Sequence, residues 1–284
     1  MNDSPKTKKS LGQHWLSDDA SLEAMLEAAE VSTEDTVLEI GPGPGTLTAK
    51  LVERAKQVIA VEFDPDLVRD LPARLKSTPQ HNLCKDVPRK DRKGGVISNL
   101  QVVEADILKF DLTSLTPGYK VAANIPYYLT SNLLRILCES PNPFSVAALL
   151  LQKEVAERVC AKPGGMSILS VSVQFYCEAS LGPLVPACLF TPPPKVDSQI
   201  LKLVYRSEPL YPDVDRKKFF RIVKAGFAQR RKIILNTLSA GLHLGREETA
   251  AILEAADVPP SARAQNLSLD DWHTLYETIF SKEA

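Results

Sequence analysis

Short apolar runs rich in β-branched residues alternate with amphipathic stretches along the first two-thirds of the chain. This alternation is typical of βαβ units, in which parallel strands are covered by helices. The runs expected to form strands are residues 36–40, 58–62, 101–105, 120–124, 146–151, 173–177 and 199–205. The stretches expected to form helices are residues 20–29, 47–54, 65–75, 131–139 and 153–160. The pattern therefore predicts an α/β fold.

Beyond Tyr211-Pro212 the apolar positions recur at helical spacing to the end of the chain. The expected helices are residues 216–227, 231–240, 247–255 and 270–280. We place the domain boundary so that residues 1–207 form the α/β domain and residues 208–284 a small helical domain. Residues 76–98 interrupt the first pattern with prolines, basic residues and a glycine pair, and we interpret them as a mobile surface insertion.

Composition narrows the class of protein. No apolar run approaches the roughly 20 residues of a membrane span, and no apolar segment of a secretory signal follows the polar N-terminus. The five cysteines form no C-x-x-C pair, and the four histidines are too scattered for a metal motif. We therefore expect a reduced cytoplasmic protein without a membrane segment or a metal site, and we expect a monomer.

Net charge argues against a nucleic-acid partner at first, because the whole chain carries only −1. Residues 206–232, however, hold nine basic residues against three acidic ones. Lys217, Arg221 and Lys224 share one helical face, and Arg230, Arg231 and Lys232 follow them. This distribution indicates phosphate contacts, although a merely solvated helix face remains an alternative.

A glycine-rich turn follows the first expected strand. Gly41, Gly43 and Gly45 lie between this strand and the next expected helix, where glycine lets the backbone approach a nucleotide-like ligand closely. A dinucleotide-binding motif needs glycine at position 46, where this chain has threonine. This weakens the hypothesis that the turn binds a nicotinamide dinucleotide. A loop whose glycines only permit a turn remains the alternative.

Two acidic residues lie at the ends of the next two expected strands. Glu62 ends the second expected strand, and Asp106 lies just past the third. The carboxyl ends of neighbouring strands line one crevice in a doubly wound sheet. We expect Glu62 to accept hydrogen bonds from ribose hydroxyls and Asp106 to accept one from an adenine amino group.

The most specific signal is Asn124-Ile125-Pro126-Tyr127 at the end of the fourth expected strand. An adenine amino nitrogen is a poor nucleophile because its lone pair is delocalised into the ring. The Asn124 side-chain oxygen and the Ile125 carbonyl are two acceptors for its N–H bonds, and Pro126 stiffens the turn. Tyr127 offers a face on which an extruded base can stack. The alternative is a strand-ending turn with a core tyrosine.

Phe190 opens a proline-rich loop, Thr191-Pro192-Pro193-Pro194, immediately before the last expected strand. A loop held in an extended conformation brings Phe190 to the other face of the same base. A domain linker with Phe190 in the core is nearly as compatible with the spacing.

With these residues in place, the chain resembles the KsgA-type (RsmA) family of rRNA adenine dimethyltransferases along nearly its whole length. The resemblance is carried by Leu11-Gly12-Gln13-His14-Trp15-Leu16, by Glu39 to Thr48, by Asn124 to Tyr127, by Phe190 to Ser198, by Gln229 to Lys232 with Asn236, and by Arg263 to Ser268. His14 stands where asparagine is more familiar in this family.

The resemblance implies a Rossmann-like S-adenosylmethionine-dependent methyltransferase domain, with a mostly parallel seven-stranded sheet and an appended helical RNA-recognition domain. It implies N6,N6-dimethylation of two adjacent adenosines near the 3′ end of small-subunit rRNA, within a pre-ribosomal small subunit. The implied cofactor-binding residues are Gln13, His14, Leu16, Gly41, Gly43, Gly45, Glu62, Asp106 and Asn124. The implied catalytic residues are Asn124, Ile125, Pro126, Tyr127 and Phe190.

Two other functions share part of this pattern. Large-subunit rRNA methyltransferases that confer macrolide resistance have similar cofactor and catalytic motifs, but the C-terminal signatures favour the KsgA-type family. A non-catalytic assembly or transcription factor on the same fold is the second alternative. The presence of Glu62, Asp106 and the Asn124–Tyr127 turn argues against it.

Overall fold

The computed structural model of the 284-residue chain describes residues 12–77 and 97–280. Its main sheet has seven strands in the order β4-β3-β2-β5-β6-β9-β7. These strands are β2 (Thr36–Ile40), β3 (Gln57–Glu62), β4 (Leu100–Glu104), β5 (Lys120–Asn124), β6 (Val146–Gln152), β7 (Cys177–Val185) and β9 (Ser198–Tyr205). Strands β4, β3, β2, β5 and β6 pair in parallel, each with its neighbour. The predicted α/β class is confirmed.

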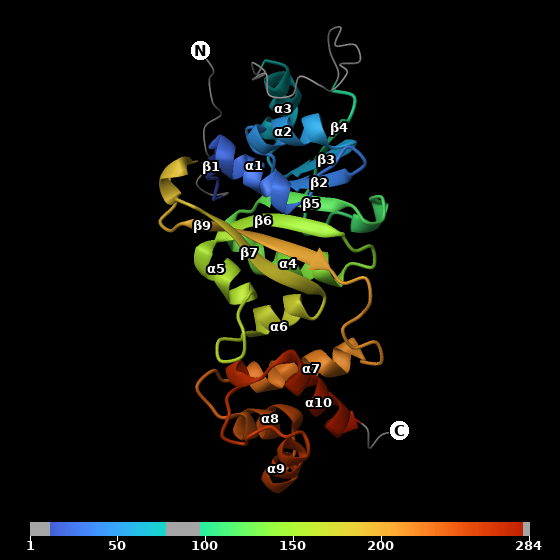
Figure 1. Ribbon diagram of the computed structural model, residues 1–284, viewed down its shortest axis with the longest axis vertical. Coiled ribbons are helices and arrows are strands. Elements are labelled where there is room, and N and C mark those ends of the chain that lie inside the picture. The colour runs from blue at the N-terminus through green and yellow to red at the C-terminus, as the bar shows by residue number, and fades with distance from the viewer. Residues whose placement is uncertain (1–11, 78–96, 281–284) are drawn as a thin grey trace. The chain divides into compact units, whose positions relative to one another are not determined.

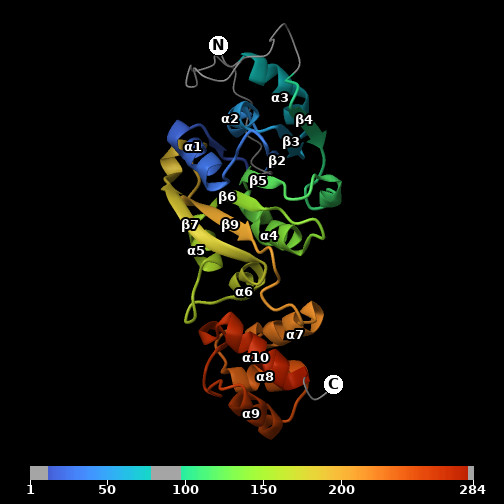
Figure 2. The same ribbon diagram turned by 45° about the vertical axis from the view of Figure 1, so that its right-hand side comes forward.

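Helices cover this part of the sheet as βαβ connections require (Figures 1 and 2). They are α1 (Asp19–Ala28), α2 (Thr46–Arg54), α3 (Pro65–Ser77) and α4 (Thr130–Glu139). Helix α1 packs against α2 and β6, α2 against β3, and α3 against β3 and β4. Helix α1 begins where it does because the Asp18 carboxylate accepts a hydrogen bond from the Ser21 backbone N–H at 2.8 Å.

A second, two-stranded sheet joins distant parts of the sequence. Strand β1 (Trp15–Leu16) pairs antiparallel with β8 (Phe190–Thr191), so that Leu16 lies opposite Phe190. Both of these side chains are buried in the same hydrophobic cluster as α1 and α2. The hydroxyl of Thr46 at the start of α2 donates to the Leu16 carbonyl at 2.8 Å. The N-terminal motif is thereby held beside the glycine-rich turn.

The chain divides into two compact units, Met1–Lys153 with Leu181–Leu203, and Glu154–Ser180 with Val204–Ala284. The second unit contains most of α5 (Lys153–Val159), then α6 (Ile168–Gln174), α7 (Arg216–Phe227), α8 (Ile234–Leu242), α9 (Arg246–Ala255) and α10 (Leu269–Phe280). Figure 1 shows α7 to α10 gathered in one helical group. The helical character of the C-terminal part is confirmed, and the boundary at residues 207 and 208 stays a prediction.

Backbone hydrogen bonds explain why residues 154–180 group with the C-terminal helices. The carbonyl of Gln265 accepts hydrogen bonds from the backbone N–H groups of Gly164 at 2.8 Å and Met166 at 3.2 Å. The ring of Phe175 packs on Phe219, with 4.9 Å between the centroids. These contacts join segments about 40 to 100 residues apart in sequence, which a local pattern does not reveal.

Two predicted elements are wrong in position. Residues 173–177 are not a strand, because α6 occupies Ile168–Gln174 and β7 starts only at Cys177. Ser167 and Ser170 form a capping box that starts this helix, and the helix continues through Gln174 into the predicted strand. Helix α8 begins at Ile234 rather than at residue 231, which leaves Arg230, Arg231 and Lys232 in the preceding connection.

Two further predictions concern the insertion at residues 76–98 and the absence of a membrane-spanning helix. The proposed insertion at residues 76–98 lies mostly outside the described residues, and α3 extends through Ser77. Among the described helices, none is long and apolar enough to cross a bilayer.

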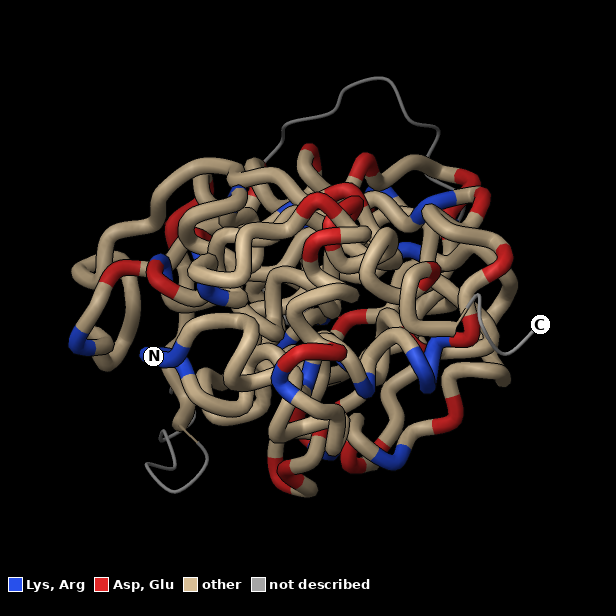
Figure 3. Tube along the Cα trace, turned by 90° about the horizontal axis from the view of Figure 1, so that it is seen from below, with Lys and Arg blue, Asp and Glu red and all other residues tan. Residues whose placement is uncertain are grey.

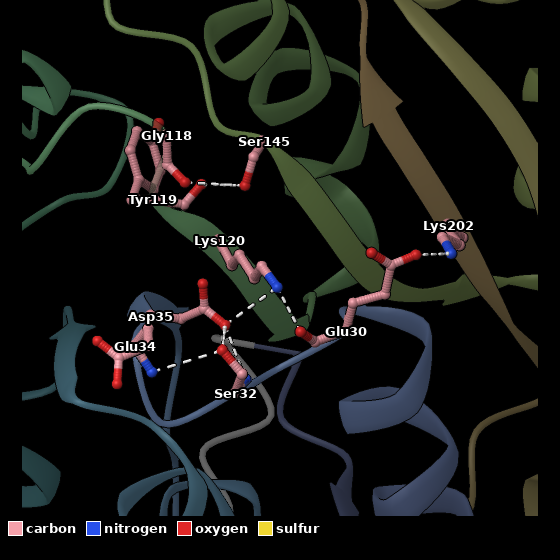
Figure 4. Close-up of polar contacts among 9 residues, drawn as sticks. All are labelled: Glu30, Ser32, Glu34, Asp35, Gly118, Tyr119, Lys120, Ser145 and Lys202. Carbon is pink, nitrogen blue, oxygen red and sulfur yellow. Dashed lines mark hydrogen bonds and ion pairs between the residues drawn. The ribbon is translucent and has the colours of Figure 1, made fainter.

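An ion-pair network stabilises the end of the sheet opposite to the crevice (Figure 4). Lys120 at the start of β5 contacts the Asp35 carboxylate at 3.0 Å and also donates to the Glu30 carbonyl. Lys202 of β9 contacts the Glu30 carboxylate at 2.5 Å. Hydrogen bonding from Lys202 lowers the pKa of Glu30. Burial opposes a similar shift at Asp35, but hydrogen bonds from Ser32 and Lys120 outweigh it and lower the pKa of Asp35.

We expect this network to contribute to stability at neutral pH and to lose its contribution in acid. Both carboxyls have lowered folded-state pKa values, so the contribution is complete above their ordinary values of 3.8 and 4.5 and disappears as the pH falls through the lowered ones. Lys120→Met should lower the free energy of unfolding at pH 7 by on the order of 1–2 kcal/mol and flatten its acid dependence. Denaturant titrations between pH 3 and 7 measure both quantities. The matched control is Lys109→Met, at an exposed lysine, and equal losses in the two variants would contradict the assignment.

Candidate active site

The strand order places a crevice at the carboxyl ends of β2 and β5. From β2 the chain proceeds outward through β3 and β4, and β5 then returns to the other side of β2. Such a reversal opens a crevice between the loops that leave the two neighbouring strands. The glycine-rich turn follows β2, and the Asn124 turn follows β5. The topology therefore brings the two predicted motifs together.

A cavity of about 350 Å³ occupies this crevice. Its lining includes nearly every predicted site residue of the first unit: Gln13, His14, Leu16, Gly41, Gly43, Glu62, Asp106, Asn124, Ile125, Pro126 and Tyr127. Gly45 and Phe190 are not part of the lining. The structure thus gathers residues from five separate chain segments around one cavity.

Glu62 is a buried carboxylate fixed by backbone donors. Its Oε2 accepts from the Gly43 N–H at 3.2 Å, and its Oε1 accepts from the N–H groups of Phe63 and Asp64 at 2.9 Å each. Burial raises the pKa of Glu62, and these three N–H groups hold the increase back. The side chain is therefore held rigidly between the glycine-rich turn and the end of β3.

The cavity is lined by acidic side chains. Glu39, Glu62 and Asp106 line it, whereas none of its described lining residues is a lysine or an arginine. Burial raises the pKa of Glu39 to about 8, and the nearby Glu62 charge adds to this increase. Glu39 is therefore mostly protonated at neutral pH, and the remaining carboxyls favour a ligand with positive charge and disfavour a diphosphate group.

Two of the three predicted glycines differ in their structural role. Gly41 has φ +68°, and a Cβ atom at this position would meet no other atom within 4 Å, so its backbone borders open space in the cavity wall. Gly45 has φ +93°, and a Cβ atom there would lie 2.6 Å from Leu71 Cδ1. The structure therefore assigns Gly45 to the packing of α2 against α3, and its predicted contact with a cofactor is not supported by its position.

The two polar atoms of the Asn124 side chain differ in their contacts within the described part of the chain. Its Nδ2 donates to the His14 carbonyl at 2.9 Å, and a carbonyl only accepts, so this contact fixes the orientation of the amide. Among the described residues, neither Asn124 Oδ1 nor the Ile125 carbonyl oxygen receives a hydrogen bond. Both predicted acceptors are thus free, and both residues line the cavity.

Tyr127 is half-buried and held from two sides. Its hydroxyl lies 3.1 Å from Ser198 Oγ, and its ring stacks on His14 with 5.9 Å between centroids. His14 Nδ1 lies 2.7 Å from the Pro192 carbonyl, so Nδ1 carries the proton and donates. His14 therefore connects the proline-rich loop to the turn after β5.

Phe190 lies elsewhere than the stacking interpretation requires. Its side chain is 3% exposed and belongs to the hydrophobic core cluster. The ring offers no free face to a base in this structure, because β8 pairs with β1 and directs Phe190 between the sheet and α1. The structure favours the core position that the sequence left as the alternative.

The predicted RNA-binding residues all lie in the second unit and are exposed: Lys217, Arg221, Lys224, Arg230, Arg231 and Lys232. Lys217, Arg221 and Lys224 project from α7, whose opposite face buries Phe219, Ile222 and Val223. Elsewhere acidic and basic positions are interspersed along the chain (Figure 3). Within the described residues, none of the six forms an ion pair with an acidic side chain.

Several lining residues were not predicted as site residues from the sequence: Trp15, Glu39, Phe63 and Tyr128. Glu39 had a recognisable signal, because it is an acidic residue within the apolar run Thr-Val-Leu-Glu-Ile of β2. Phe63 and Tyr128 each directly follow a predicted site residue, and their exposure of 61% and 62% is visible only in the structure. Among the described residues no group of histidine, cysteine and acidic side chains is arranged to hold a metal ion.

Comparison with known proteins places this geometry in context. Residues 4–280 match the family described as ribosomal RNA adenine dimethylase. Ribosomal RNA small subunit methyltransferase A of Dehalococcoides mccartyi is 37% identical over 273 residues, covering 95% of this chain and 87% of that protein. The crystal structure of a dimethyladenosine transferase from Plasmodium falciparum superposes with a TM-score of 0.74 at 28% identity, covering 95% and 98% of the two chains. That of the 23S rRNA methyltransferase ErmE superposes with a TM-score of 0.72 at 28% identity, covering 93% and 98%.

Proposed function

Because the chain belongs to the ribosomal RNA adenine dimethylase family, we propose that it dimethylates N6 of two adjacent adenosines near the 3′ end of small-subunit rRNA. The single observation that carries this proposal is the turn after β5. There, Asn124 Oδ1 and the Ile125 carbonyl form a pair of free acceptors at the cavity. An adenine amino group has two N–H bonds, and two such acceptors hold it with its lone pair directed away from them.

The enzyme uses S-adenosylmethionine, which supplies a methyl group bound to a positively charged sulfur. The cavity suits this group, because its carboxyls are not offset by any lysine or arginine among the described lining residues. The open space beside Gly41 admits close approach of a ligand to the backbone. We assign Glu62 to the ribose hydroxyls and Asp106 to the adenine amino group, with Gln13, His14, Leu16 and Gly43 completing the wall.

The fold alone does not identify the target subunit, since the structures of the 23S rRNA methyltransferase and of the dimethyladenosine transferase superpose about equally well on this chain. The test is incubation of the protein with tritiated S-adenosylmethionine and purified ribosomal subunits that lack the modification. We expect label in small-subunit rRNA, located by mass spectrometry at two neighbouring adenosines. Label in large-subunit rRNA would favour a resistance-type methyltransferase, and no label in either would favour a non-catalytic assembly factor.

We further propose that residues 208–284 recognise rRNA in a pre-ribosomal small subunit, and that the protein acts as a monomer in the cytoplasm. The support is the exposed basic face of α7 together with Arg230, Arg231 and Lys232. Exposed cations without acidic partners are free to replace counterions on RNA phosphates.

Replacing Lys217, Arg221 and Lys224 together with glutamine should weaken RNA binding and reduce its salt dependence. Each lost phosphate contact lowers the slope of log affinity against log salt by about 0.7–0.9, so the triple variant should lose about 2–3. Filter binding between 50 and 300 mM salt measures this slope. The control changes three other exposed lysines to glutamine, Lys56, Lys109 and Lys162. A slope equal to that of the control would return α7 to the status of a solvated face.

A further inference from the structure

Two consecutive tyrosines leave the turn after β5 in different environments. Tyr127 is half-buried, with its ring on His14 and its hydroxyl near Ser198. Tyr128 is 62% exposed although it lines the same cavity. Both belong to a short 3₁₀ helix, η3 (Tyr127–Leu129), in which successive side chains project about 120° apart. The two rings therefore face different spaces at one cavity.

Tyr128 is held in place despite its exposure. The Leu129 N–H donates to the Pro126 carbonyl at 3.0 Å, and the Thr130 hydroxyl donates to the Tyr127 carbonyl at 3.1 Å, which fixes the backbone on both sides. The Gly12 backbone lies along one edge of the ring, because a Cβ atom at Gly12 would lie 3.6 Å from both Cδ1 and Cε1. A ring ordered before binding loses little conformational freedom when a ligand stacks on it.

The chemistry of the cavity identifies the kind of ligand group that this ring receives. A single exposed apolar side chain is ordinary on a protein surface, but Tyr128 is exposed at the cavity that also holds Asn124 and Glu62. Among the described residues that line the cavity there is no lysine or arginine, so none of them offers a phosphate a cationic partner. Stacking on a nucleobase needs no such partner and is tolerant of sequence.

Phe63 is equally exposed, but it follows β3, two strand positions from β5. At the usual strand spacing this is about 10 Å away from the strand that carries Asn124. Tyr128 is only four residues after Asn124. Of the two exposed rings, Tyr128 is the one beside the target amine.

We propose that Tyr128 stacks on the base of the nucleotide next to the target adenosine, while Tyr127 faces the target base. This inference rests on the proposed function, in which the two modified adenosines are adjacent. Because the RNA strand has one direction, Tyr128 receives the untargeted adenosine for only one of the two targets, and it receives the next nucleotide along the strand for the other. Tyr128 is a positioning residue for the substrate and not for the cofactor.

The test uses the full-length protein and Tyr128→Ala, Tyr128→Phe and Tyr128→Leu variants. Steady-state methylation of unmodified small subunits gives KM and kcat, and calorimetry gives the affinity for S-adenosylmethionine. An rRNA fragment with 2-aminopurine in place of one adenosine at a time reports stacking, because stacking on an aromatic ring quenches its fluorescence. Leu184→Ala, at an exposed apolar residue of β7 outside the cavity lining, is the matched control.

For Tyr128→Ala we expect KM for small subunits to rise on the order of tenfold, corresponding to one lost base stack. The quenching of 2-aminopurine beside the target should be lost, with the cofactor affinity unchanged within about twofold. Tyr128→Phe should keep the wild-type KM and the wild-type quenching because it keeps the ring, whereas Tyr128→Leu should not. The effect should also be nearly independent of salt, unlike that of the α7 variant.

Different outcomes distinguish the two proposals. If the wild type methylates small subunits and Tyr128→Ala keeps its KM and its quenching, the stacking inference fails and the proposed function stands. Equal impairment of Tyr128→Phe and Tyr128→Ala would assign the role to the hydroxyl, and a parallel loss of cofactor affinity would assign it to the cofactor. If the wild type labels no small-subunit RNA, both proposals fail.

Discussion

Replacing Asn124 with alanine is expected to slow methyl transfer by about a hundredfold to a thousandfold, the typical cost of losing one preorganised contact to developing charge. The amide is preorganised, since its Nδ2 is bound to the His14 carbonyl at 2.9 Å and its Oδ1 has no partner among the described residues. An acceptor at Oδ1 gains most when the target nitrogen becomes positive. Its removal therefore raises the barrier more than it weakens binding of the ground state.

The measurement is a single-turnover assay on small subunits at saturating enzyme and cofactor, with cofactor affinity determined by calorimetry. Asn132→Ala, at an exposed residue of α4, provides a matched control with the same change of side chain. A folded, saturated Asn124→Ala protein within a few-fold of wild type would remove Asn124 from catalysis. A change confined to cofactor affinity would make Asn124 a binding residue and leave the Ile125 carbonyl as the main acceptor.

Glu62→Ala is expected to weaken binding of S-adenosylmethionine roughly tenfold or more, because a charged acceptor for ribose hydroxyls contributes on the order of 1.5–3 kcal/mol. The structure adds a second expectation. The carboxylate also accepts hydrogen bonds from the N–H groups of Gly43, Phe63 and Asp64, so alanine leaves three donors in a largely buried place. The variant should therefore also melt at a lower temperature than wild type.

The Glu62→Gln variant separates the contribution of Glu62 to cofactor binding from its contribution to the stability of the fold. Glutamine keeps one carbonyl oxygen for the Phe63 and Asp64 donors but places an NH₂ group against the Gly43 N–H. We expect weaker cofactor binding with a smaller loss of stability than in the alanine variant. Glu104→Ala is the matched control, because Glu104 lies opposite Glu62 in the register of β3 and β4 but is exposed and outside the cavity lining. Unchanged cofactor affinity in folded Glu62→Ala protein would exclude Glu62 from the cofactor site.

The sequence by itself determined the elements whose pattern is local. Strands β2 and β5 and helix α7 have the predicted bounds, because a buried parallel strand needs a nearly continuous apolar run and a surface helix needs a stripe of apolar residues. The glycine-rich turn, Glu62, Asp106 and the Asn124 turn were recognisable because each lies at the end of such a run or just past it. The rule that ligands bind at the carboxyl ends of strands then indicated that they meet.

The tertiary structure decided what depends on contacts between distant segments. The sequence was compatible with Phe190 either as a base-stacking residue or as a core residue. In the structure, the pairing of β8 with β1 directs its side chain into the core. The role of Gly45 depended on Leu71, 26 positions along the chain. Similarly, the grouping of residues 154–180 depended on the Gln265 carbonyl, and the free acceptor of Asn124 on the carbonyl of His14. A local pattern records which faces must be buried, but only the folded chain determines which partners bury them and which polar atoms remain free.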